Sequence, residues 1–343
     1  MREVKEGGIM GKWRRRAVAA LIAPVLILAV AWCAGALWFD GPASRWQAGL
    51  LAAGFLLACL AIAAGLRPPR RAAFAVAFAV LFVAAWWIRI PPSNDRDWQR
   101  DVALLPTAEL SGSRLTVHNV RNFDYRSETD YIERWETRSY DLDALQGIDI
   151  FLCYWGPTLI AHTIVSWEFA DGSRLAASIE TRKEAGESYS AVRGFFRQFE
   201  IYYVLADERD VVRLRTNHRG ERVFLYRMKA TPTQARALLL EYVAEINGLA
   251  RRPRWYNALT NSCTTAIRHH AQRIQAANPW DWRILANGLA DRMSYERGSI
   301  DTSLPFEELR RRSEVTERAR AAGQAPDFSR RIRVGLPGKG NRP

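Results

Sequence analysis

The stretch IAHTIVSWEFADGSRLAASIETRKE, residues 160–184, contains two runs of alternating apolar residues separated by Asp171-Gly172. Alternation with a period of two is typical of β-strands, and Asp-Gly is a strong signal for a tight turn between them. If the apolar residues of both strands share one face, the residue numbers of each cross-strand pair must add up to an even number. A two-residue loop gives an odd sum. We therefore expect an odd-length loop, about three residues with a glycine-assisted bulge. The apolar face is assigned to Val165, Trp167, Phe169, Leu175, Ala177 and Ile179.

This register places His162 and Glu180 nearly opposite each other, on the face away from those apolar residues. A carboxylate that accepts a hydrogen bond from one imidazole nitrogen fixes the tautomer of the ring and raises its basicity. The pair therefore predicts a general base with its orienting acid. Another interpretation stays open, because a histidine in a strand is commonly a satisfied surface or core group. The charged run ETRKE around Glu180 is also typical of a solvated strand edge.

A lone cysteine, Cys263, lies within WYNALTNSCTTAIRHHAQ, residues 255–272, where a helix is expected to begin. The N–H groups and dipole of a helix N-terminus stabilise a thiolate and can stabilise an oxyanion, so Cys263 is the candidate nucleophile. A small buried core residue is the alternative. The neighbouring His269-His270 pair suggests a metal site with Cys263, but the spacing matches no common zinc site, so no metal is expected.

The region around these motifs is predicted to form one α+β domain, residues 91–320. Thr231-Pro232 predicts the start of an amphipathic helix, and a second helix is expected from about Cys263 to Ala276. Residues 321–343 are basic and lack periodicity, so an extended or disordered tail is expected there. Between Leu104 and Tyr226, short runs rich in β-branched and aromatic residues predict strands: RLTVHNV, IDIFLCYW, AHTIVSWEF, LAASIE, YYVL and VFLYRM.

Three apolar runs, residues 17–39, 48–66 and 72–90, are each long enough to cross a hydrocarbon core of about 30 Å. Basic residues precede the first run and occupy the second loop, LRPPRR, whereas the first loop, DGPASRWQ, carries only Arg45. The positive-inside rule therefore predicts a cytoplasmic N-terminus, and three crossings place the chain after Pro91 outside the cytoplasm. A cleaved signal peptide is the alternative for the first run.

The formal net charge of +13 on 343 residues raises the question of a nucleic-acid partner. Basic residues are scattered among acidic ones through residues 94–320, without an aromatic-interleaved basic stripe, so no nucleic acid is expected. In a membrane-tethered domain this charge is expected to meet anionic lipid head groups. Outside the apolar runs, Cys153 and Cys263 could form one disulfide, but nothing in the sequence requires it.

The hairpin of residues 160–184 and the later WYNALTNSCTT resemble the Lnb N-terminal periplasmic domain family. PPSNDRDWQ, HNVRNFDYR, RGFFRQFE and DTSLPFEELRRRS fit the same family, so the resemblance covers roughly residues 91–335. The order of histidine, polar partner and cysteine is also similar to circularly permuted papain-like (NlpC-like) enzymes. These likenesses imply an antiparallel sheet with packed helices and a catalytic set of His162, Glu180 and Cys263. Four further residues are expected to contact the substrate: Tyr154, Asn261, Thr264 and Arg182.

The resemblance implies thiol-based acyl chemistry without a cofactor, because the named member of the family acylates bacterial lipoproteins with a lipid donor. That acylase lacks the three N-terminal spans of this chain. We expect an inner-membrane, periplasm-facing cysteine-dependent acyltransferase or hydrolase acting on phospholipid or lipoprotein substrates through a thioester intermediate. One alternative is a peptidoglycan or protein amidase or peptidase. The other is a non-catalytic membrane binding or assembly protein.

Overall fold

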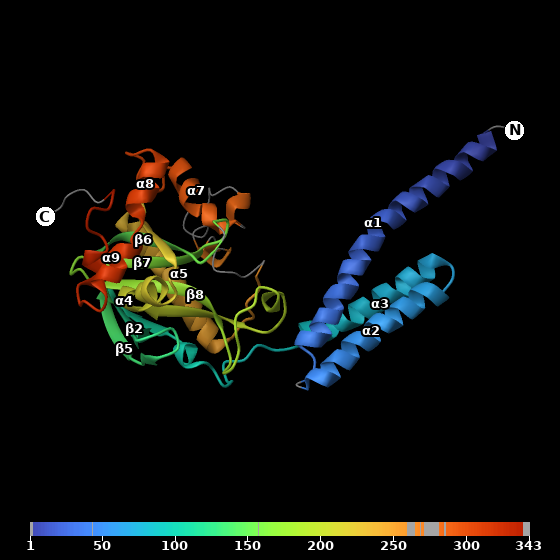
Figure 1. Cartoon of the computed structure of the whole chain (residues 1–343), viewed down its shortest axis with the longest axis horizontal. Coiled ribbons are helices and arrows are strands. Elements are labelled where there is room, and N and C mark those ends of the chain that lie inside the picture. The colour runs from blue at the N-terminus through green and yellow to red at the C-terminus, as the bar shows by residue number, and fades with distance from the viewer. Residues whose placement is uncertain are drawn as a thin grey trace. The chain divides into compact units, whose positions relative to one another are not determined.

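The computed structural model describes residues 3–42, 44–156, 158–258, 265–267, 269–270, 281–284 and 286–338 (Figure 1). The chain divides into two compact units. One comprises Met1–Pro92 with Ser190–Gln198, and the other comprises Ser93–Tyr189 with Phe199–Pro343. We call them the membrane unit and the sheet unit.

The membrane unit contains the long helices α1 (Glu3–Phe39), α2 (Arg45–Gly65) and α3 (Pro69–Ile88). Within the described part of the chain, three helical segments are long and apolar enough to cross a membrane: Ala20–Phe39, Arg45–Gly65 and Pro69–Ile88. Large apolar side chains lie exposed along them, as lipid contact requires; Leu28 is 70% exposed and Phe78 is 72% exposed. The predicted three apolar helices are therefore confirmed.

The sheet unit is built on one mixed sheet, in which the order of strands is β1-β2-β9-β8-β7-β6-β10 and β5 also pairs with β2. Neighbouring strands are antiparallel, except that β2 and β9 run parallel. All six predicted strand runs form strands, which confirms the α+β class. The strands of this sheet are β1 (Thr107–Ser111), β2 (Arg114–Arg121), β5 (Trp135–Asp141), β6 (Leu145–Tyr154), β7 (His162–Phe169), β8 (Arg174–Arg182), β9 (Glu200–Ala206) and β10 (Arg222–Arg227).

The β7–β8 hairpin has the predicted register. Val165 lies opposite Ala177 and Trp167 opposite Leu175, so paired positions sum to an even number. The Phe169 N–H donates to the Ser173 carbonyl, which closes a three-residue loop, residues 170–172. Gly172 lies in that loop at φ +82°, a left-handed conformation that favours glycine. The odd-length loop is therefore confirmed.

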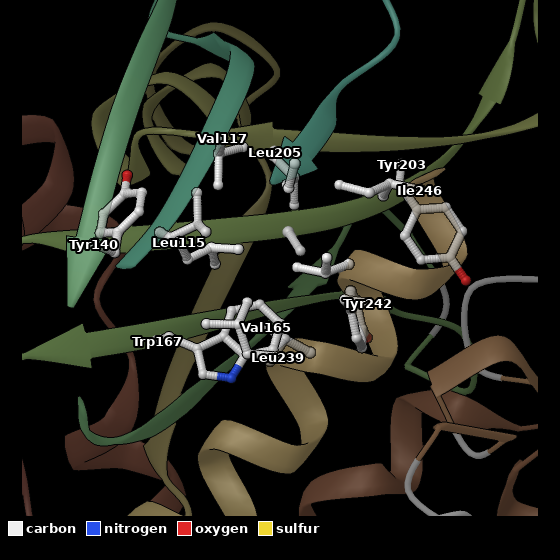
Figure 2. Packing of buried hydrophobic residues seen from close by; sticks show 14 of the residues in the cluster. Leu115, Val117, Tyr140, Val165, Trp167, Tyr203, Leu205, Leu239, Tyr242 and Ile246 are labelled. Atoms are coloured by element: carbon white, nitrogen blue, oxygen red, sulfur yellow. The ribbon is translucent and has the colours of Figure 1, made fainter. Parts of the chain in front are cut away.

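Helix α5 (Pro232–Arg251) packs on the predicted apolar face and forms what we call the α5-side core (Figure 2). Thr231 and Gln234 form a reciprocal capping box at its N-terminus, as the Thr231-Pro232 signal predicts. Figure 2 shows Trp167 and Val165 of β7 facing Leu239 and Tyr242 of the helix. This helix is therefore fixed to the sheet by apolar burial on a single face.

The opposite face is also covered, which the sequence does not indicate. Helices α4 (Glu208–Arg213), η4 (Leu214–His218), α9 (Thr316–Ala322) and α10 (Phe328–Arg331) lie over it. Ile164 and Ala176 of the hairpin join Phe328 and Ile332 in this α4-side core. His162 and Glu180 therefore project away from the α5-side core, as predicted, but toward a second buried layer.

Residues 321–338 are folded, so the expectation of an extended or disordered tail is wrong for them. Phe328 and Ile332 are buried in the α4-side core, and Arg333 is only 6% exposed. The Arg333 guanidinium donates to Asp149 at 2.7 Å and to Glu208 at 2.6 Å. Burial of Phe328 and Ile332 and the ion pairs of Arg333 thus order a segment whose basic composition is typical of a disordered tail.

The remaining described elements are short. The helices α7 (Ala290–Glu296) and α8 (Phe306–Ser313) lie near β6 and β10, in a small core with Leu152, Tyr154 and Phe224. The others are the hairpin β3 (Asp124–Tyr125) and β4 (Tyr131–Ile132) and the 3₁₀ turns η1 (Arg100–Val102), η2 (Leu142–Ala144), η3 (Arg193–Phe195), η5 (Trp282–Ile284) and η6 (Asn287–Leu289).

Candidate active site

His162 and Glu180 meet across the β7–β8 hairpin. Ile164 lies opposite Ser178, so the same register places His162, two residues earlier, opposite Glu180. The His162 Nε2 and Glu180 Oε1 atoms are 3.2 Å apart, and the imidazole side chain is 9% exposed. The prediction that the two residues share a face is confirmed.

A buried arginine holds the Glu180 carboxylate. The Arg215 side chain lies 2.8 Å from Glu180 Oε1 and 3.1 Å from a carboxylate oxygen of Glu221. Burial alone would raise the pKa of Glu180, but the positive charges of His162 and Arg215 outweigh it and hold that pKa well below its usual range. Arg215 belongs to η4, a π-helix, a rare conformation that is frequent at functional sites. Glu180 is therefore ionised at neutral pH.

Ser178 links the histidine to the carboxylate and fixes which imidazole nitrogen carries the proton. Its hydroxyl is fully buried, lies 2.6 Å from His162 Nε2 and donates to Glu180 Oε1 at 2.7 Å. An ionised carboxylate only accepts hydrogen bonds, so the single hydroxyl proton of Ser178 points at Glu180. The Ser178 oxygen then accepts from Nε2–H, which makes Nδ1 the basic nitrogen of the neutral ring. The network thus leaves Nδ1 as the ring nitrogen of neutral His162 that can accept a proton.

Cys263 lies outside the described residues, as do the predicted substrate contacts Asn261 and Thr264. The chain approaching them pairs with the sheet, because Trp255 forms a bridge with Glu200 at the start of β9. After them, Ala266 is buried in the α5-side core. The His270 ring lies 2.9 Å from the Tyr203 hydroxyl on the same side of the sheet.

The described cysteine beside His162 is unsuited to nucleophilic chemistry. Cys153 of β6 lies directly opposite His162 and is completely buried in the α4-side core. Burial raises the pKa of its thiol strongly, and this outweighs the nearby charge of Arg215. Cys153 is therefore a packing residue. Among the described residues, no group of three His, Cys, Asp or Glu side chains is arranged to hold a metal ion.

Tyr154 is not brought together with His162. Because Cys153 and His162 share one face, Tyr154 projects from the other face of β6. There it is 6% exposed, and its hydroxyl donates to the Gly288 carbonyl at 2.7 Å. These contacts make Tyr154 a packing residue that joins β6 to the segment around Gly288.

Arg182 lies two residues beyond Glu180 on the same face of β8, but its guanidinium binds backbone. It donates to the carbonyls of Val102 and Ala103 at 3.0 and 2.7 Å, and it stacks 4.2 Å above the Trp98 ring. Burial lowers the pKa of Arg182 to about 10. The side chain therefore fastens the segment 94–103 to the sheet.

Sequence reasoning missed Ser178 and Arg215. Ser178 had a usable signal, because the inferred register already places it on the face of His162 and Glu180. Arg215 had none, since it lies 35 residues beyond Glu180 in an irregular turn of helix.

Comparison with known proteins identifies the family of the domain that contains these residues. The sequence model of the Lnb N-terminal periplasmic domain matches residues 131–288, a range that contains His162, Ser178, Glu180, Arg215 and the position of Cys263. No curated protein and no solved structure matches the chain. The likeness to papain-like enzymes therefore stays a prediction. Through residues 131–288 this chain belongs to the Lnb N-terminal periplasmic domain family, and it is a membrane protein with a periplasmic domain.

Proposed function

We propose that the chain is a cysteine-dependent acyltransferase or hydrolase of the bacterial inner membrane, with Cys263 as nucleophile and His162 as base. Its N-terminus is cytoplasmic, and its catalytic domain, from residue 91 to about residue 320, faces the periplasm. The substrates are lipid-linked: a phospholipid acyl ester as donor, and a lipoprotein amine or water as acceptor.

The observation that carries this proposal is the network of His162, Ser178, Glu180 and Arg215. A buried histidine needs one partner at each ring nitrogen, whereas Nε2 of this one faces a buried hydroxyl that is backed by a carboxylate and a buried arginine. That arrangement supports a ring that gains a proton at Nδ1 during each turnover.

The proposed reaction has two steps. In the first, the Cys263 thiol gives its proton to Nδ1 and the thiolate attacks the ester carbonyl. A thioester forms, and the imidazolium returns the proton to the departing alcohol. In the second, His162 takes a proton from an amine or water, which attacks the thioester and restores the thiol. Glu180 stabilises the imidazolium in both steps.

The chain before Cys263 comes within reach of His162 in the plane of the sheet, whereas Ala266 and His270 after it pack on the α5 side, the face opposite His162. Trp255 pairs with β9, and β8 lies between β9 and β7, so about three strand spacings of roughly 4.8 Å separate that segment from His162. The six residues from Asn257 to Cys263 can span up to about 20 Å. The order of strand histidine, polar partner on the next strand and later cysteine supports a permuted papain-like arrangement.

The membrane unit supports a lipid substrate. Three apolar helices give more anchoring than a soluble periplasmic amidase requires. Arg89 is exposed directly after the last span, where a cationic side chain would meet phospholipid head groups, whereas Arg96 and Arg100 are paired with Glu184 and Glu133.

The test is mass spectrometry of the full-length protein after incubation with phospholipid vesicles. We expect an acyl adduct on Cys263 and release of lyso-phospholipid, both lost in Cys263→Ser and strongly reduced in His162→Ala. Cys153→Ala is the matched control and should keep both signals, because Cys153 is buried and its thiol pKa is raised.

Two outcomes would contradict the proposal. Identical lipid products in wild type and Cys263→Ser, together with cell-wall peptides altered by the variant, would assign an amidase. A Cys263 thiol no more reactive than Cys153 in the folded protein would assign a binding role without catalysis.

A further inference from the structure

The segment SAVRGFFRQ, residues 190–198, follows β8 and precedes β9 in the chain, yet it belongs to the membrane unit. Asp40, directly after α1, fastens it. One Asp40 carboxylate oxygen accepts from the Trp87 indole at 2.6 Å and from the Arg197 backbone N–H at 3.1 Å. The other oxygen accepts from the Gln198 amide at 2.7 Å. Through Asp40, these contacts join residues 190–198 to the C-terminal ends of α1 and α3.

Apolar contacts reinforce this attachment. Phe196 is 7% exposed and stacks on Phe39, with ring centroids 4.8 Å apart. A Cβ atom on Gly35 would lie 2.5 Å from the Phe196 ring, so the ring needs a residue without a side chain beneath it. The Arg197 guanidinium lies 4.4 Å above the Trp87 ring. The segment is therefore a built part of the membrane unit.

Tryptophans mark the level of this attachment in the bilayer. Trp38 lies near the end of α1, Trp46 near the start of α2 and Trp86 near the end of α3, and these residues are between 36% and 67% exposed. Tryptophan is enriched at the boundary between head groups and acyl chains, so a ring of such residues at one end of three spans locates that boundary. The contacts to Phe39, Asp40 and Trp87 place the segment at the same level.

The segment also presents apolar side chains that no protein contact covers fully. Val192, directly before the short turn η3, is 58% exposed, and Phe195, the last residue of that turn, is 37% exposed. Isolated exposed apolar residues are ordinary on a soluble surface, but these two lie at the level of the tryptophans. We propose that residues 190–198 form an interfacial membrane-binding element, whose partner is the phospholipid bilayer and whose inserted residues are Val192 and Phe195.

The proposal is tested by nitroxide labels on the full-length protein in phospholipid nanodiscs that hold one copy each. Every labelled variant also carries Cys263→Ser, so that this cysteine takes no label. The cysteines Cys33, Cys59 and Cys153 are buried and are left in place. Labels at Val192→Cys and Phe195→Cys should collide with oxygen more than with a water-soluble nickel chelate. Leu57→Cys, 66% exposed within α2, is the lipid reference, and Glu109→Cys, 82% exposed at its side chain, is the aqueous reference.

A second variant tests the attachment. Asp40→Ala removes the acceptor of three hydrogen bonds, so the nickel-chelate collision rate at residue 192 should rise several-fold toward the aqueous reference. Asp95→Ala, an exposed aspartate near the last span, is the matched control and should leave it unchanged.

Three outcomes would overturn the proposal. The first is a nickel-chelate collision rate at residues 192 and 195 equal to that at residue 109. The second is low collision with both reagents, which would mean that protein covers the two residues. The third is an Asp40→Ala variant whose labels behave as in the parent protein. None of these readouts depends on catalytic activity.

Discussion

The substitution Glu180→Gln tests whether the Glu180 carboxylate stabilises the His162 imidazolium. Glu180→Gln keeps the length of the side chain but removes the charge 3.2 Å from Nε2. A hydrogen bond to a charged group contributes about 1.5–3 kcal/mol, which is the stabilisation that the thiolate–imidazolium pair would lose. Since about 1.36 kcal/mol corresponds to a factor of ten, alkylation of Cys263 at neutral pH should slow roughly 10- to 150-fold. The apparent pKa of the thiol should rise by about one to two pH units, because loss of the negative charge disfavours the protonated ring.

The assay is iodoacetamide alkylation of the full-length protein in detergent, followed by mass spectrometry of the Cys263 peptide between roughly pH 5 and pH 9. Glu221→Gln is the matched control. It removes the other carboxylate that Arg215 binds and leaves the charge of Glu180 in place, so it should alkylate nearly as wild type does. A Glu180→Gln variant with wild-type rate and pH profile would refute the orienting role. Equal slowing in both variants would attribute the effect to disturbance of Arg215.

Reporter fusions after residue 92 should be active outside the cytoplasm, and fusions at Pro68 inside it; a cytoplasmic signal after residue 92 would contradict the orientation. Burial alone would raise the pKa of Glu208, but the positive charges of Arg333 and Arg174 have the larger effect, so that this pKa is lowered to about 2. The ionised carboxylate therefore stabilises the fold above its ordinary pKa of about 4.3, and this contribution is lost as the pH falls toward 2. Arg333→Met should lower the free energy of unfolding by about 3 kcal/mol at pH 7, and the difference from wild type in urea titrations should shrink toward pH 3. A difference independent of pH would exclude ionisation of Glu208 as its cause. Arg182→Met should speed amide exchange in the segment 94–103 and leave the reactivity of the thiol unchanged. A folded variant with a less reactive thiol would instead support the predicted role of Arg182 at the substrate.

The hairpin was predictable because strand periodicity and loop parity are local properties of the sequence. They placed His162, Glu180 and the α5-side core correctly. The α4-side core was not predictable from the same pattern, because its face of β7 carries polar residues that usually meet water. Ser166, for example, is fully buried and donates to Glu208 at 2.5 Å. Partners 42 residues away in the sequence leave no periodic signal.

The candidate site also has one part that the sequence predicts and one part that it does not. The pair His162 and Glu180 follows from one hairpin, whereas Arg215 reaches Glu180 from a π-helix that residue spacing does not predict. Tyr154 was expected at the substrate, but its orientation depends on how β6 pairs with β7. That pairing turns Tyr154 to the face opposite His162, and no short-range pattern specifies it.

The burial of Arg333 has a consequence for how the protein is made. Asp149 lies 184 residues earlier in the chain than Arg333, one of its three arginine partners. At synthesis rates of about 5–20 residues per second, β6 emerges roughly 10–40 s before that partner. During this interval Asp149 has its earlier partners Arg174 and Arg227, but the α4-side layer still lacks Phe328 and Ile332, which cover it in the finished chain. A nascent chain interrupted before Phe328 would leave that layer open to proteases, so its resistance to proteolysis should depend on translation of residues 328–333.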